Sequence, residues 1–115
     1  MIKIRIGNDF STIWALKRLG EPEDLSNATD MELIVKSVEI NKAIDFEVVD
    51  TDKLRIAFTS KILTHTGKYN LRFSYYLPEG GETLKHTLDI DPFEIVAQSE
   101  EADVVDEFTI TSEVG

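Results

Sequence analysis

Residues 67–90 decide the fold, and they read GKYNLRFSYYLPEGGETLKHTLDI. Apolar side chains alternate with polar ones on both sides of a central turn, which is the period of strands that each bury one face. Proline at the start of the turn fixes its own φ, and the two glycines accept positive φ. We predict a β-hairpin with loop 78–81 and Tyr75 opposite Leu84, or a tighter turn on Gly80-Gly81 that keeps the same parity. The side chains expected on the buried face are Tyr69, Leu71, Phe73, Tyr75, Leu77, Leu84, His86, Leu88 and Ile90.

Residues 10–19 fit two structures. Alternation of Phe10, Thr12, Trp14 and Leu16 favours a strand, whereas Asp9 as an N-cap and Gly20 as a stop favour a helix. Because the neighbouring segments have strand patterns, we expect a strand with Trp14 in the core.

The same period-two pattern recurs along the chain. It predicts an opening strand at 2–6, a strand at 31–36 with a bulge near Ser37, and a second hairpin over 44–58. Residues 60–66 break the pattern and are expected to form a corner whose Ile62 or Leu63 closes the end of the core. Asp91-Pro92 is expected to interrupt pairing and leave 93–97 as an edge strand or one that changes sheets.

About seven to nine short strands predict an all-β, antiparallel, immunoglobulin-like β-sandwich. Residues 1–97 are expected to form this domain, and residues 98–115 an acidic C-terminal tail or linker with an extra strand at 108–114. The core is expected to enclose Trp14, Leu33, Phe58, Leu71, Phe73 and Leu88.

Charge and composition narrow the classes of partner. The chain of 115 residues carries 22 acidic against 12 basic residues, a net charge of −10, which disfavours nucleic acid and anionic lipid as partners. Six of the acids and none of the bases lie in residues 98–115. Without cysteine, the core must be held by packing alone. The chain has neither a signal-peptide pattern nor a run of membrane-spanning length, so we expect a soluble protein.

Residues 63–71, LTHTGKYNL, resemble the corner that leads into strand F of immunoglobulin-like domains, where a G-x-Y-x-C run is familiar. The resemblance makes Gly67 and Tyr69 the structural corner, with the Tyr69 hydroxyl bonded back to the upstream backbone. Leu71 stands where a disulfide cysteine would be, so the resemblance concerns architecture and excludes an antibody-type domain.

A wider resemblance runs through residues 5–97. The loop GEPEDLSNATD at 20–30, preceded by RIGNDF at 5–10 and followed late in the chain by TGKY at 66–69, is similar to the N-terminal immunoglobulin-like module of phage baseplate upper proteins and related prophage tail proteins. That family carries a G-x-P-x-D-L-[S/T]-x-A-T loop between its first strands. The resemblance implies a non-enzymatic structural module in the virion, or in the host cytoplasm during assembly. Its implied partners are other tail or baseplate proteins, with a second copy of the chain as an alternative.

Candidate chemistry is sparse. His86 lies on the predicted buried face and is interpreted as a hydrogen-bonded core histidine, and His65 as a solvated or capping residue. Two histidines on unrelated elements give no zinc spacing, and no serine lies in a recognisable catalytic motif. We therefore expect no catalytic residue, no metal and no cofactor. The pairs Asp50/Asp52 and Asp89/Asp91 are interpreted as turn aspartates rather than calcium ligands.

Four residues are candidates for an interface. Tyr76 and Arg72 lie on the outward face of the first hairpin strand, and Phe108 and Ile110 lie in the C-terminal strand pattern. The competing hypothesis is a surface adhesion or carbohydrate-binding module, which would use exposed aromatic side chains on a polar face.

Overall fold

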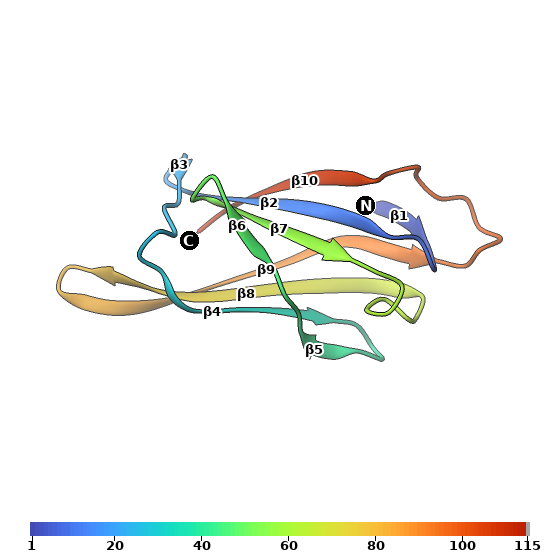
Figure 1. Cartoon of the computed structure of the whole chain (residues 1–115), viewed down its shortest axis with the longest axis horizontal. Helices are drawn as coiled ribbons and strands as arrows, with labels where there is room; N and C mark the ends of the chain where they lie inside the picture. Colours follow the sequence, from blue (N-terminus) through green and yellow to red (C-terminus); the bar gives the residue numbers. More distant parts are fainter. Residues whose placement is uncertain (115) are drawn as a thin grey trace.

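The computed structural model describes residues 1–114 as two sheets packed face to face (Figure 1). One sheet has the strand order β1-β9-β8-β4-β5, and the other has the order β10-β2-β7-β6, with the short β3 paired to β2. The strands are β1 (Ile2–Arg5), β2 (Phe10–Arg18), β3 (Glu21–Pro22), β4 (Thr29–Lys36), β5 (Asn41–Ala43), β6 (Glu47–Val49), β7 (Lys53–Phe58), β8 (Gly67–Glu79), β9 (Glu82–Val96) and β10 (Glu107–Glu113).

This topology is immunoglobulin-like, as predicted. With β2, β4, β6, β7, β8 and β9 taken as strands B, C, D, E, F and G, the two sheets have the immunoglobulin orders C-F-G and B-E-D. Two strand pairs depart from the expected antiparallel pattern, because β1 pairs in parallel with β9 and β10 pairs in parallel with β2. The C-terminal strand β10 thus lies at the edge of its sheet, beside strand B (β2).

The ambiguity at residues 10–19 is resolved as strand β2, which pairs with β7 through Phe10 opposite Phe58 and Trp14 opposite Leu54. A strand is favoured because both sheet neighbours need its backbone donors, and a helix would satisfy those donors internally. The predicted interior is confirmed: all six expected core residues are at least nine-tenths buried, and the Trp14 side chain is fully buried.

The main hairpin is confirmed, but its turn is the tighter of the two alternatives. Glu79 pairs with Glu82 around Gly80-Gly81, so Tyr75 lies opposite His86 and not opposite Leu84. The glycines have φ values of +58° and +85°, and such two-residue turns match the twist of the flanking strands. Leu84, expected on the buried face, is 42% exposed because the hairpin projects beyond the end of β4, which last pairs with it at Tyr76 (Figure 1).

The structure has two bulges, and neither lies at Ser37, where one was predicted. Ser37 belongs to the turn between β4 and β5, and the register shift in β4 falls between Thr29 and Glu32. Pro92 lies inside β9, opposite the shift between Tyr69 and Leu71. A bulge frees one residue from the ladder, which is how a proline without an N–H fits inside a strand. The segment 93–96 is therefore no edge, because β8 and β1 flank it on both sides.

The corner at residues 60–66 forms as expected. Leu63 donates its backbone N–H to the carbonyl oxygen of Thr59 at 3.1 Å, a single helical turn, and its side chain is 3% exposed at the end of the core. Leu63 therefore closes that end of the sandwich.

Candidate functional site

The predicted outward residues of β8 both have neighbours on the next strand. The Arg72 guanidinium bonds the carboxylate of Asp89, directly opposite on β9, with both Nε–O distances at 3.2 Å. Tyr76 is half-buried, and the ammonium of Lys85, opposite it on β9, lies 5.8 Å from the centre of its ring. Both side chains thus face outward on one polar strand pair, each in contact with a cross-strand partner.

The other two interface candidates lie on the opposite sheet and face inward. Phe108 is opposite Thr12 and Ile110 is opposite Trp14, so they share the inward face of β2. Phe108 stacks on Phe10 at a ring-centre distance of 6.0 Å. Phe108 and Ile110 are half-buried and pack against the core cluster, so they close the open side of the sandwich next to β2.

Strand β10 also supplies the hydrogen-bond partner of the buried tryptophan. The Trp14 indole Nε1–H donates to the hydroxyl of Ser112 at 2.8 Å. A buried indole without an acceptor would lose the hydrogen bond that it makes to water in the unfolded chain. The C-terminal segment is therefore part of the interior, although its acidic composition separates it from residues 1–97.

The corner residues lie at the start of β8. The hydroxyl of the fully buried Tyr69 donates to the carbonyl oxygen of His65 at 2.6 Å, the contact typical of a tyrosine corner. Burial raises the pKa of Tyr69 and outweighs its hydrogen bonds. Gly67 has φ = +125°, a conformation that side chains with a Cβ rarely adopt.

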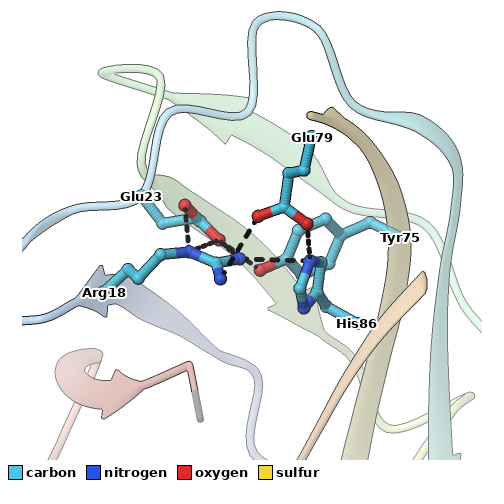
Figure 2. A network of polar contacts seen from close by, with 5 residues as sticks. All are labelled: Arg18, Glu23, Tyr75, Glu79 and His86. Atoms are coloured by element: carbon cyan, nitrogen blue, oxygen red, sulfur yellow. Dashed lines mark hydrogen bonds and ion pairs between the residues drawn. The ribbon is translucent and has the colours of Figure 1, made fainter. Parts of the chain in front are cut away.

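A polar network that the sequence did not predict lies at the other end of the sandwich (Figure 2). Its members come from both sheets: Arg18 ends β2, Glu23 follows β3, and the hairpin of β8 and β9 contributes Tyr75, Glu79 and His86. Glu23 is 6% exposed and Tyr75 is fully buried. The network therefore joins the two sheets where the projecting hairpin leaves the body of the domain.

Glu23 is the centre of this network. Its carboxylate accepts three hydrogen bonds from the Arg18 guanidinium, the shortest at 2.7 Å from Nη2, and one from the Tyr75 hydroxyl at 2.7 Å. Such charge-assisted, forked contacts are among the stronger hydrogen bonds in proteins. The buried carboxylate is thereby fully hydrogen-bonded.

Glu79 and His86 continue the network toward solvent. Glu79 lies 3.3 Å from Arg18 Nη1 through one oxygen and 2.9 Å from His86 Nε2 through the other. Arg18 Nη2 lies 3.2 Å from the same imidazole nitrogen, but a single nitrogen cannot both donate to Glu79 and accept from Arg18. We assign the proton to Nε2, because the negatively charged oxygen of Glu79 lies closer to this nitrogen than Arg18 Nη2 does.

The pKa values follow from these contacts. Burial favours the neutral form of Glu23, but the hydrogen bonds from Arg18 and Tyr75 and the nearby positive charge outweigh it, so the pKa of Glu23 lies below its usual value. Burial, then the bond to the Glu23 carboxylate, raises the pKa of Tyr75 far above its ordinary value. The hydrogen bond to Glu23 raises the pKa of Arg18, so the pair stays ionised at neutral pH.

Because its members satisfy one another, the network serves to hold the two sheets together. One signal for it was present in the sequence, since acidic residues follow Arg18 across the short Leu19-Gly20 turn. Glu21 lies directly opposite Arg18, and Glu23, two residues further on, is a diagonal neighbour within reach of the long arginine side chain. The hairpin partners could not be found in this way, because Tyr75 and His86 are distant in sequence.

The remaining candidate ligands have other contacts. Asp52 accepts a hydrogen bond from Lys53, Asp91 accepts one from Asn70, and His65 contacts Thr64. Within residues 1–114, no group of three or more His, Cys, Asp or Glu side chains is arranged to hold a metal ion. A solvent-open groove of about 710 Å³ lies between the chain joining β5 to β6 and strand β7, with Ile44, Phe46 and Ile62 inside and Lys42, Asp45 and Arg55 among its charged residues.

The chain was compared with known proteins. No family model matches it, and no curated protein matches it significantly. In the part of the chain that the structure describes, no helix has the length and apolarity needed to cross a membrane.

Proposed function

We propose that this protein is a non-enzymatic structural module of a phage or prophage tail or baseplate, acting through protein–protein assembly. The virion, or the host cytoplasm during assembly, is then its location, and other tail or baseplate proteins are its partners. The proposal rests on the resemblance of the 20–30 loop and on what the residues of this loop do in the fold.

The loop residues that carry the resemblance also build the connection between strands B and C. Asp24 accepts a hydrogen bond from the backbone N–H of Ser26 at 2.9 Å, which turns the chain. Leu25 is 3% exposed, and its N–H donates to the carbonyl oxygen of Thr51 at 2.8 Å. A module shared between proteins would keep residues that have such structural roles. The structural role of these loop residues is the single observation that carries the proposal.

The shape and the polar groups of the domain agree with an assembly role. The molecule measures 54 × 25 × 20 Å, and its β8–β9 hairpin projects from one end (Figure 1). The buried carboxylate of Glu23 joins the two sheets through its hydrogen bonds from Arg18 and Tyr75. An elongated domain offers neighbours long sides and a projecting hairpin to bind.

The alternative, a surface adhesion or carbohydrate-binding module, requires an aromatic side chain with a free ring face. Tyr76 is the aromatic residue on the polar outer face, and it is half-buried with Lys85 already positioned over its ring. This contact favours the assembly proposal over sugar stacking.

The test is to follow the chain in particles induced from its source strain. Particles would be purified on a density gradient, the chain quantified by peptide mass spectrometry, and an antibody against it used for immunogold electron microscopy. We expect the chain to sediment with tailed particles and the label to lie on the tail or baseplate. A chain found only in the free protein fraction or on the cell surface would contradict the proposal.

A further inference from the structure

The two sheets end in four edge strands, which differ in how they are protected. Strands β5 and β6 have three residues each, too short to offer much backbone to a neighbour. Strand β1 has four residues and β10 has seven. A sheet edge recruits other strands through its unpaired N–H and C=O groups, so β1 and β10 are the edges to compare.

The edge of β1 is closed by the chain itself. The Ile6 N–H donates to the carbonyl oxygen of Val96 at 2.9 Å. Because alternate residues of a strand bond the same neighbour, the even-numbered residues of β1 bond β9, and the backbone groups of Lys3 and Arg5 point away from it. The Lys3 N–H donates to the Asp103 carboxylate at 2.9 Å, and the Asp103 N–H donates to the Lys3 carbonyl oxygen at 2.8 Å. The Asn8 N–H donates to the carbonyl oxygen of Arg5 at 3.2 Å. No strand can add there without displacing these contacts.

The edge of β10 is open over its whole length. The Ser11 N–H donates to the carbonyl oxygen of Asp106 at 2.9 Å, and the Val114 N–H donates to that of Lys17 at 2.6 Å. These two bonds fix the phase of the pair, so the even-numbered residues of β10 bond β2. The N–H and C=O groups that point outward belong to the odd-numbered residues Glu107, Thr109, Thr111 and Glu113. In the described residues 1–114, β2 is the one strand paired with β10, so no strand bonds these outward groups.

We propose that the outer edge of β10 is a strand-addition site for an extended segment of another protein that carries a basic residue at each end. Main-chain hydrogen bonds to Thr109 and Thr111 would hold the segment, and its side chains would set the specificity. The site is distinct from the polar network and from the outward face of β8.

The side chains of β10 define the segment that fits. Glu107 and Glu113 are exposed at the two ends, on the outer face of the sheet. One oxygen of Glu107 lies 3.4 Å from the Arg55 guanidinium, and one oxygen of Glu113 accepts a 3.4 Å hydrogen bond from the Gly20 N–H, so the second oxygen of each carboxylate is the one offered to a partner. Residues 98–115 hold six acids and no base. Basic residues six positions apart in the partner would lie opposite the two glutamates, where opposite charges stabilise a strand pair. Apolar residues on the other face of the segment would cover the half-buried Phe108 and Ile110.

The same charges disfavour a second copy as the occupant. Antiparallel pairing of two β10 strands over their full length is centred on Ile110 and places Glu107 of each copy opposite Glu113 of the other. Like charges directly opposite each other destabilise a pair of strands, and two acidic segments would also repel at longer range. Charge complementarity therefore selects a basic partner.

This inference rests on the proposed assembly function, because it names the surface and the partner class through which assembly would occur. The two can fail separately. The protein could sediment with tailed particles while its β10 edge binds nothing, or the edge could bind basic strands in a protein that never enters a particle.

The experiment uses the full chain and a synthetic peptide, acetyl-Lys-Val-Thr-Val-Thr-Val-Lys-amide, which presents two basic ends in either strand direction. Amide chemical shifts of the ¹⁵N-labelled protein would be followed during titration. We expect saturable shifts in residues 107–113, weaker binding at high salt, and loss of binding when both lysines are replaced by glutamate. A peptide N-methylated at its threonines would lose antiparallel binding, and one N-methylated at its valines would lose parallel binding.

Thr111→Pro is the matched variant of the protein, because it removes one outward N–H and leaves the ladder to β2 intact. We expect about tenfold weaker peptide binding than for Thr111→Val, the loss expected for one hydrogen bond. If the proline variant fails to fold, the N-methylated peptides test the same bonds from the other side. The inference would be overturned by shifts outside β10, by equal binding of the glutamate peptide, by retained binding of both N-methylated peptides, or by self-association through β10 in analytical ultracentrifugation.

Discussion

At the base of the β8–β9 hairpin, Arg18 bonds the carboxylates of both Glu23 and Glu79, whereas along β10, within the described residues 1–114, no strand lies beside the outward backbone groups of Thr109 and Thr111. Both regions are polar, and both lie at the boundary of the interior. In the first, each polar group is satisfied by the same chain, so the region contributes to stability. In the second, the outward N–H and C=O groups must bond to water or to another chain, so the region is available for binding.

Among substitutions in the polar network, Glu23→Gln should cause the largest loss of stability, about 2–3 kcal/mol in the free energy of unfolding. The amide keeps the volume but presents N–H groups to the Arg18 donors and leaves that guanidinium without its carboxylate. Chemical denaturation followed by tryptophan fluorescence would measure the loss. Glu21→Gln, an exposed position two residues away, is the control and should change stability by less than about 0.5 kcal/mol.

Acid should remove the same contribution. Because the pKa of Glu23 is lower in the folded protein than in the unfolded chain, its contribution is complete above the unfolded pKa of about 4.3 and is lost as pH falls through the folded pKa. The stability difference between wild type and Glu23→Gln should therefore narrow below about pH 4.3. A difference that stays constant from pH 6 to pH 3 would contradict the role assigned to the ionised carboxylate.

Tyr75→Phe should cost about 1–2 kcal/mol, since it removes the buried hydroxyl that donates to Glu23 and leaves the ring in place. Tyr76→Phe, on the outer face of the same strand, should change the melting temperature little. Equal losses in the two variants would mean that the Tyr75 hydroxyl bond contributes nothing specific.

Asp103→Ala should leave an outward backbone N–H of β1 without its acceptor, as the outward N–H groups of β10 are. The Lys3 amide would lose its acceptor, and we expect its hydrogen exchange to become about fivefold faster, with little change at core amides. Asp106→Ala is the control, because Asp106 bonds β2 through its backbone. An unchanged rate at Lys3 would indicate that this edge is closed by something other than Asp103.

Thr111→Pro should have the smallest effect, a change below about 0.5 kcal/mol, because its N–H points away from β2. Ile110→Pro, one residue earlier, removes a donor of the β2 ladder and should cost about 3 kcal/mol or more. Thermal denaturation of the two variants would check the phase assigned to β10. Similar losses in both would show that the outward edge is misassigned.

Local patterns were enough to predict several features. The alternation of Phe10, Thr12, Trp14 and Leu16 indicated a buried face, and the G-x-Y corner indicated the position of Tyr69. Gly80-Gly81 identified the turn, although its loop length remained open between two alternatives of the same parity. The exposure of Leu84 was not predictable, because it depends on where β4 ends on the neighbouring side of β8.

The sequence by itself determined the period of the long strands, the position of the main turn and most of the residues that are buried, because these depend on side-chain chemistry and on φ preferences within a few residues. Apart from the hairpins, only the tertiary structure decided which strands are neighbours. That choice brings Ser112 to Trp14 and Tyr75 to Glu23, and in the described part of the chain it leaves one side of β10 without a partner strand. Contacts between distant segments depend on the packing of the whole core, and a local pattern of residues carries no information on which edge the last strand will join.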